Sequence, residues 1–406
     1  MTENKRNFLH VGLFLLTFVT TTFAGVEWQW GRSVLYGEIT MSWQDFIDAL
    51  NFSIPFLVIL TFHEFGHFFT ARHHGIKVSL PYYFPFWLGF IGVPSLGTMG
   101  AFIRIREAIK SRTHYFDVGI SGPLAGFVIA LGVLWYGFAS LPETTYIYEV
   151  HPEYEVFGEN FEEEMKGIDR WVYQSEMNPD RYNYALVDSV YVGGKGGLYF
   201  GDNILLNLFR DHVAPRDRYI PSSKEIMHYP WLLAGYLALF FTALNLLPIG
   251  QLDGGHVVYG LFGAVWHKRI STALFSLFLF YAGLGWVRMD HMVGNSVEDA
   301  LGFLVQVGAY LYILYICTYS MFPSKRDRWM YAAIMLAIQF FLSSFLDWDG
   351  YNGWIFFGVL LGRFVGIQHP GAADDRPLTT NRKILGWVAL IIFILSFSPQ
   401  PMVLDI

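Results

Sequence analysis

Long apolar runs separated by short polar connections dominate the pattern of hydrophobic and polar residues along the chain. A transmembrane helix needs roughly 20 mainly apolar residues to cross the hydrocarbon core of a bilayer. Runs of this kind cover 9–24, a stretch from 52 to a basic exit at 72, 117–139, a stretch that begins at 231, 271–287, 299–321, 329–346, 353–367 and 384–398. The pattern predicts an all-α polytopic membrane protein with about nine transmembrane helices.

The first apolar run, 9–24, follows Lys5 and Arg6 and ends in Thr22-Phe23-Ala24-Gly25. A secretory signal peptide has the same basic start, apolar middle and small-residue end. We favour a retained span, because the rest of the chain is itself rich in membrane segments. A cleaved leader is the alternative.

The region from Val78 to Phe102 is apolar and aromatic but does not read as a continuous helix. Prolines and glycines interrupt it at Pro81, Pro85, Gly89, Gly92, Pro94, Gly97 and Gly100. Proline removes a backbone donor and glycine weakens a helix, so this density argues against a spanning helix. Non-helical backbone is tolerated at membrane depth only where protein or a water-filled cavity shields it. We therefore expect a re-entrant loop or hairpin here.

These patterns divide the chain into five parts. They are 1–50, an N-terminal span and its connection; 51–139, the first part of a core; 140–230, an extramembrane loop; 231–266, the second part of the core; and 267–406, additional C-terminal spans. The 140–230 loop has more acidic than basic residues, including Glu162, Glu163 and Glu164, and shows no persuasive strand alternation. We expect an irregular cap on the non-cytoplasmic side, because basic clusters flank the spans on the other side.

Composition supports a membrane protein, since 53% of the 406 residues are hydrophobic, 18% are aromatic and only 15% are charged. The formal net charge of −7 argues against a nucleic-acid partner, which would require basic stripes. The single cysteine, Cys317, lies in an apolar run, so no intrachain disulfide framework or cysteine-based zinc site is expected. Any metal must therefore be held by His, Asp and Glu.

The apolar run from 52 to 72 contains the pentad His63-Glu64-Phe65-Gly66-His67. Histidines four residues apart leave the same face of a helix, so His63 and His67 can bind one metal ion. Glu64 beside them can accept a proton from an attacking water. Ionisable residues at membrane depth are costly and are functional candidates by default. The alternative is a buried, hydrogen-bonded histidine pair in a helix bundle.

A catalytic zinc ion needs three protein ligands and one open position. His63 and His67 supply two ligands, and Asp253, an acid in an apolar setting, is the candidate for the third. Pro248, Gly250, Gly254 and Gly255 break the helix around Asp253, so its short side chain can reach another helix. Two neutral imidazoles with ionised Glu64 and Asp253 would neutralise Zn²⁺, which lowers the cost of burying these charges.

The same residues predict a hydrolytic reaction in which Glu64 acts as general base and later returns the proton to the leaving amine. Asn245, eight residues before Asp253, is a candidate donor to the oxyanion, although a helix–helix hydrogen bond explains a buried amide equally well. His256 follows the aspartate motif and is a candidate partner of a metal ligand. The remaining histidines, including His73, His74, His212 and His228, are expected to be structural or interfacial.

A transmembrane helix is a poor protease substrate, because its carbonyl groups are already hydrogen-bonded. The segment Leu96–Ile103 combines small residues with an alternating tail, and it could offer a strand edge to an extended substrate. We therefore expect substrate to bind Gly97, Thr98, Met99 and Gly100, in a re-entrant loop or hairpin near the active site.

Together the motifs resemble the site-2 protease family of intramembrane zinc metalloproteases. The likeness rests on His63-Glu64-Phe65-Gly66-His67, on Gly122-Pro123 and on Asn245-x-x-Pro248-x-x-x-Leu252-Asp253-Gly254, and it covers roughly 50–139 and 231–266. The resemblance implies that His63, His67 and Asp253 bind zinc, that Glu64 is the base and that Asn245 assists substrate or oxyanion binding. The additional C-terminal spans are reminiscent of a branch found in chloroplasts and many bacteria.

We therefore expect a zinc metalloendopeptidase that cuts within or near transmembrane segments of membrane-tethered proteins. Its partners would be the lipid bilayer and a membrane-protein substrate with a transmembrane helix, in a bacterial inner membrane with the active site toward the cytoplasm. Two other classes stay open. A transporter or catalytically silent scaffold could hold charges around broken helices, and a membrane di-iron oxidase would use histidines such as His63, His67, His73 and His74 but needs further clusters.

Overall fold

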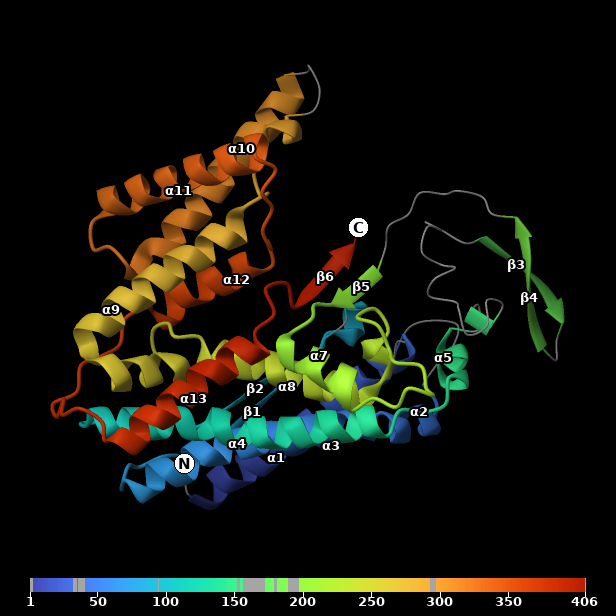
Figure 1. The fold of residues 1–406 in the computed structure, drawn as a ribbon, viewed down its shortest axis with the longest axis horizontal. Coiled ribbons are helices and arrows are strands. Elements are labelled where there is room, and N and C mark those ends of the chain that lie inside the picture. Colours follow the sequence, from blue (N-terminus) through green and yellow to red (C-terminus); the bar gives the residue numbers. More distant parts are fainter. Residues whose placement is uncertain are drawn as a thin grey trace.

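The computed structural model of the protein describes residues 3–31, 35, 41–93, 95–151, 154–155, 172–178, 181–188, 197–292 and 297–405. Helices dominate this part of the chain, and the strands are short and lie in three separate pairs (Figure 1). The prediction of a largely helical protein is therefore confirmed, but the all-α description is wrong because short strands are present.

The elements before residue 213 are α1 (Glu3–Trp30), α2 (Trp43–Asp48), α3 (Leu50–His73), β1 (Tyr82–Phe86), the 3-10 turn η1 (Gly89–Ile91), β2 (Gly97–Phe102), α4 (Arg112–Ala139), α5 (Thr145–Val150), β3 (Val172–Asn178), β4 (Arg181–Asp188), β5 (Gly197–Phe200) and α7 (Ile204–His212). The later elements are η3 (Ile226–His228), α8 (Pro230–Leu246), α9 (Asp253–Gly283), η4 (Met289–His291), α10 (Val297–Cys317), η5 (Thr318–Ser320), α11 (Lys325–Phe345), α12 (Trp354–Val359), the π-helical turn η6 (Leu360–Val365), α13 (Thr380–Ser396) and β6 (Met402–Asp405).

Helices α1, α3, α4 and α8 pack together as one group, which is visible in Figure 1. Their shared core is apolar and includes the buried side chains of Phe56, Leu134 and Leu237. The contact between α3 and α4 is unusually close, because a Cβ atom on Gly66 would lie 2.6 Å from the carbonyl oxygen of Ser121. Only a residue without a side chain allows the two backbones to approach in this way.

Helices α9, α10, α11 and α12 form a second group with an apolar core, and a buried amide joins three of them. Gln339 of α11 donates from Nε2 to the Leu279 and Phe280 carbonyls of α9, both at 3.0 Å, and accepts from the Tyr310 hydroxyl of α10 at 2.9 Å. Such hydrogen bonds are favourable between helices in an apolar environment, because an unpaired amide there is costly. Cys317 is buried at the end of α10, as its apolar run predicted.

Helix α9 changes direction at Gly263, where φ is 78° and ψ is 176°. A positive φ favours glycine, so the sequence permits the kink at this point. Arg112, the first residue of α4, donates from Nε to the carbonyl of Gly260 just before the kink, at 3.0 Å. The first arm of α9, from Asp253 to the kink at Gly263, is thus tied to the start of α4, so the stretch 256–266 runs across the kink.

The region from Val78 to Phe102 folds as a β-hairpin. β1 and β2 pair antiparallel, with Tyr82 opposite Phe102 and Phe86 opposite Gly97, and the register shifts between them. Helix α1 supports the hairpin through three hydrogen bonds, from His10 to the Pro81 carbonyl, from Thr20 to the Gly97 carbonyl and from Trp28 to the Ser95 carbonyl. The region thus forms a hairpin, as predicted, and its re-entrant position stays a prediction.

The expected count of about nine transmembrane helices is not confirmed. Within the described residues, five helices are long and apolar enough to span a bilayer, namely Arg6–Trp30, Trp43–His73, Arg112–Ala139, Val297–Ser320 and Lys325–Phe345. Pro230–Leu246 and Trp354–Val365 are apolar but shorter. These two helices account for two of the four missing spans, because turns that contain glycine end them and leave fewer residues than a straight crossing requires.

The expectation of an irregular 140–230 loop is wrong for its described parts. β3 and β4 form an antiparallel hairpin in which Asn178 pairs with Arg181, and β5 pairs with the C-terminal β6. Neither strand of the β3–β4 hairpin alternates clearly between apolar and polar residues, so the sequence carries only a weak strand signal. The acidic run Glu162–Glu164 lies outside the described residues.

The close contact between α3 and α4 predicts that Gly66→Ala destabilises the protein. The new methyl group would meet the Ser121 carbonyl and separate the helices, at a cost of about 1–3 kcal/mol. Thermal unfolding of detergent-solubilised protein measures this loss. Gly132→Ala on α4 is the matched control, because its Cβ would meet no atom within 4 Å and should leave the melting temperature unchanged or slightly raised. Equal melting temperatures for the two variants would contradict this account.

Candidate active site

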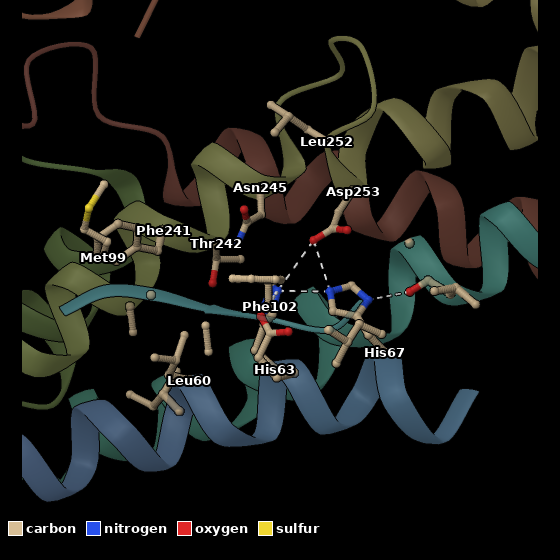
Figure 2. A pocket seen from close by; sticks show the side chains of 18 of the residues that line it. Leu60, His63, His67, Met99, Phe102, Phe241, Thr242, Asn245, Leu252 and Asp253 are labelled. Atoms are coloured by element: carbon tan, nitrogen blue, oxygen red, sulfur yellow. Dashed lines mark hydrogen bonds and ion pairs between the residues drawn. The ribbon is translucent and has the colours of Figure 1, made fainter. Parts of the chain in front are cut away.

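Helix α3 places His63 and His67 on one face, and α9 brings Asp253 to the same point (Figure 2). The Nε2 atoms of the two imidazoles are 3.1 Å apart. Oδ2 of Asp253 lies 3.5 Å from Nε2 of His63 and 3.3 Å from Nε2 of His67. Both histidines are buried, so three donor atoms meet in an interior that is otherwise mainly apolar.

The break between α8 and α9 explains how Asp253 reaches this position. Helix α8 ends at Leu246, and Gly250 adopts a φ of 62° in the turn that follows. Asp253 is the first residue of α9, so its side chain is not constrained by a preceding helical turn. A Cβ on Gly254 would lie only 2.0 Å from the carbonyl oxygen of Leu246, so glycine is required there. The predicted helix break is confirmed.

Helix α4 fixes the orientation of the His67 imidazole. Nδ1 of His67 lies 2.7 Å from the Val118 carbonyl oxygen, which can only accept, so Nδ1 carries the proton. In the neutral ring the lone pair is therefore on Nε2, which faces His63 and Asp253. Gly122 leaves the space that the ring occupies, because a Cβ there would lie 2.1 Å from Nε2 of His67.

The triangle of donor atoms fits a metal ion. Ligands about 2.0–2.2 Å from zinc in a tetrahedral arrangement are separated from one another by about 3.3–3.6 Å. The three edges of the His63–His67–Asp253 triangle, 3.1, 3.5 and 3.3 Å, lie close to this range. Two imidazoles and a carboxylate are also a donor set that zinc accepts, so these residues form a possible metal site.

Glu64 lies beside the triangle without belonging to it. Its carboxylate is 4.0 Å from Nε2 of His63 and is buried. The side chain lines the same pocket as the three donors. This position lets Glu64 contact a water or substrate next to the donors while the donors remain available to a metal.

The pocket around these residues has a volume of about 420 Å³ and is shared by α3, α8, α9 and β2. The predicted residues Thr98, Met99, Gly100 and Asn245 line it, and Figure 2 shows the Asn245 side chain directed into it. Gly97, which was also predicted to bind substrate, is not among the residues that line the pocket. A Cβ at Gly97 would meet the backbone of Thr21 at 2.3 Å, so this glycine serves the contact between the hairpin and α1.

Behind the pocket, His256 contacts His369, a residue that the sequence did not single out. Nδ1 of His256 lies 2.7 Å from Nε2 of His369. Nδ1 of His369 donates to the Pro370 carbonyl, so its Nε2 accepts from His256. Partial burial, together with neighbouring His256, lowers the pKa of His369 to about 3, so this imidazole is neutral. In the sequence, His369 appears only as an isolated histidine between two apolar segments, which gave little reason to expect it near the site.

The other histidines near the end of α3 take part in a structural network. His74 contacts Asp117 at 2.9 Å and stacks on His114 with ring centroids 4.2 Å apart. Arg382 at the start of α13 donates two hydrogen bonds to Asp117, at 2.7 and 2.9 Å. His74 thus helps to join α3, α4 and α13, as the expectation of an interfacial role implied.

Comparison with known proteins places this arrangement in a family. The model of peptidase family M50 matches residues 51–284. The chain is 26% identical over 237 residues to "Probable zinc metalloprotease EGY2, chloroplastic" of Oryza sativa subsp. indica, which covers 58% of this chain and 33% of the relative. It is 27% identical over 266 residues to "Probable zinc metalloprotease EGY1, chloroplastic" of Arabidopsis thaliana, covering 62% and 39% respectively.

The chain thus spans between a third and two fifths of the length of these curated relatives. No solved structure matches it. The family match includes all but the first residue of α3, the hairpin, α4, α8 and all of α9, and hence every residue predicted to act at the site. Because the match covers more than half of the 406 residues, the chain belongs to peptidase family M50, the site-2 protease family.

Proposed function

We propose that this protein is a zinc metalloendopeptidase that hydrolyses peptide bonds within or near transmembrane segments of membrane-tethered proteins. The observation that carries the proposal is the triangle of His63, His67 and Asp253 with Glu64 beside it. Both histidines and Glu64 lie on a helix long and apolar enough to span a bilayer. Membership of family M50 and the names of the relatives support it. The comparisons do not favour the transporter, scaffold or di-iron oxidase alternatives.

His63, His67 and Asp253 would hold the zinc ion, which when bound would polarise the scissile carbonyl and lower the pKa of the attacking water. Glu64, which is buried and next to these ligands, accepts the proton of that water and delivers it to the leaving amine. Asn245 on α8 faces the pocket, from where its amide donates to the developing oxyanion.

The hairpin supplies the surface that holds the substrate extended. Among the described strands β2 pairs only with β1, and its residues Thr98 to Phe102 line the pocket. A substrate segment can therefore add as a further strand along the free edge of β2, which places its carbonyl groups beside the donor triangle. The backbone of the substrate segment then forms its hydrogen bonds with β2 rather than within its own helix. In this proposal the hairpin is re-entrant, so that β2 lies at the depth of the transmembrane substrate.

The distribution of basic residues indicates the side of the membrane from which the site is reached. Basic residues gather at the end of the helix bundle nearest the site, with Arg72 ending α3, Arg112 opening α4 and Arg382 in the first turn of α13. Such clusters favour the cytoplasmic side or its topological equivalent. The expectation of a bacterial inner membrane is not supported, because the named relatives are chloroplastic. The lipid bilayer and a membrane-protein substrate remain the proposed partners.

Glu64→Gln should abolish cleavage without removing zinc, because residue 64 lies outside the ligand triangle. Loss of a general base typically lowers the rate by about 10²–10⁴-fold. The test measures zinc per chain and cleavage of a single-span helical substrate in proteoliposomes, for the parent and the variant. Asp253→Ala is the matched comparison and should lose both zinc and activity. A Glu64→Gln protein that still cleaves at the parent rate would refute the assignment.

Gly122→Ala should lower zinc occupancy although residue 122 has no ligand atom. Its methyl group would occupy the space of the His67 imidazole and turn Nε2 away from Asp253. Metal analysis of the purified variant checks this, with Gly132→Ala on the same helix as control. Parent-level zinc in Gly122→Ala would show that the His67 ring does not need that space.

Gly100→Val and Gly97→Val should separate the two roles of β2. A Cβ at Gly100 meets nothing within 4 Å, but valine rarely adopts the φ of 101° found there, so Gly100→Val should keep the parent zinc content and impair cleavage by distorting the strand edge. Gly97→Val should instead lower the melting temperature, because it forces the hairpin away from α1. Undiminished cleavage by Gly100→Val would rule out strand pairing at this edge.

A further inference from the structure

A second group of metal-binding side chains lies on the other side of the core. His151 follows α5, Glu225 precedes η3 and His228 ends η3. Nε2 of His151 is 3.2 Å from Nε2 of His228, and Oε2 of Glu225 is 3.6 and 3.7 Å from these two atoms. The three donors therefore form a triangle of nearly the same size as the triangle in the candidate active site.

The two sites are at opposite ends of helix α8. His228 lies two residues before its first residue, Pro230, whereas Asn245 of the active-site pocket lies in its last turn. Asn245 follows Pro230 by fifteen positions along the helix, which corresponds to about 22 Å. The second cluster is thus distinct from the site proposed for peptide hydrolysis.

Neighbouring groups orient two of the three donors. Nδ1 of His228 lies 2.8 Å from the Gln29 carbonyl oxygen, so this nitrogen carries the proton and Nε2 faces the cluster as an acceptor. The Tyr154 hydroxyl donates to Oε1 of Glu225 at 2.9 Å, which turns Oε2 toward both imidazoles. Hydrogen bonds of this kind to the remote atom of each ligand are characteristic of metal sites.

The degree of burial suits a site that can exchange metal with solvent. Glu225 and His228 are buried, whereas 28% of the His151 side chain is exposed. A hydrogen-bonded pair of imidazoles beside the carboxylate is the simpler alternative, and the zinc counts described below distinguish the two.

We propose that His151, Glu225 and His228 bind a second zinc ion, with a water molecule in the fourth position. The edges of 3.2, 3.6 and 3.7 Å agree with the separation of about 3.3–3.6 Å that tetrahedral zinc imposes on its ligands. The ion links the ends of α5 and η3 and, through the carbonyl of Gln29, the last turn of α1. It therefore stabilises the start of α8.

The test counts zinc in the full-length protein in detergent after equilibration at micromolar free Zn²⁺. The parent should hold two zinc ions per chain, His67→Ala one, and His67→Ala with His151→Ala none. His212→Ala is the matched control in the His67→Ala background, because His212 is exposed and bonds only to its own helix at the Leu208 carbonyl among the described contacts. That control should keep one zinc ion.

Two further measurements distinguish a specific loss of zinc binding from misfolding of a variant. Zinc should raise the melting temperature of His67→Ala but not of His67→Ala with His151→Ala, and Co²⁺ should give the visible absorption of a tetrahedral complex only in the former. Glu225→Gln, which keeps the shape of the side chain, should weaken zinc binding in the same background. The inference fails if His67→Ala binds no zinc, or if its zinc survives both His151→Ala and Glu225→Gln. Because the readout is metal in an inactive background, its failure leaves the proposed peptidase function untouched.

Discussion

Two imidazoles and a carboxylate can meet inside an apolar bundle only if the helices that carry them approach more closely than ordinary side chains permit. Glycine makes this possible at each contact. Gly66 lets α3 touch the backbone of α4, Gly122 leaves room for His67, and Gly254 lets the start of α9 lie against the end of α8. The donor triangle therefore depends on these three glycines as much as on the three side chains that form it. Polar groups buried in this way are tolerated because each finds a partner.

The sequence was sufficient to predict the site residues whose side-chain chemistry is unusual in their apolar surroundings. An acid after a helix break and two histidines one turn apart are rare in apolar runs, so Asp253, His63 and His67 could be brought together without coordinates. His369 and the His151–Glu225–His228 cluster could not, because each residue is ordinary in its own segment and only folding joins them. The expected number of membrane spans is not confirmed, since the apolar character of a run does not by itself show that its helix is long enough to cross a bilayer.

Residues beyond the family match complete the surroundings of the site. The match ends at residue 284, yet His369 contacts His256 in the pocket wall and Arg382 binds Asp117 of α4. Arg112 also reaches the carbonyl of Asp375 at 3.3 Å. The C-terminal helices are therefore packed onto the family core through polar contacts, and the region 366–382 is part of its structure rather than an appendage.

The order of the ligands along the chain has a consequence for biosynthesis. His63 and His67 enter the membrane early, whereas Asp253 is made only after 186 further residues, counted from His67. At typical synthesis rates this interval lasts about 10–40 s. During that time the nascent chain carries two imidazoles on α3 without the carboxylate that would complete their site. The helices of the first half must therefore insert and pack around an unfinished polar centre, and metal can be captured there only once α9 has been made.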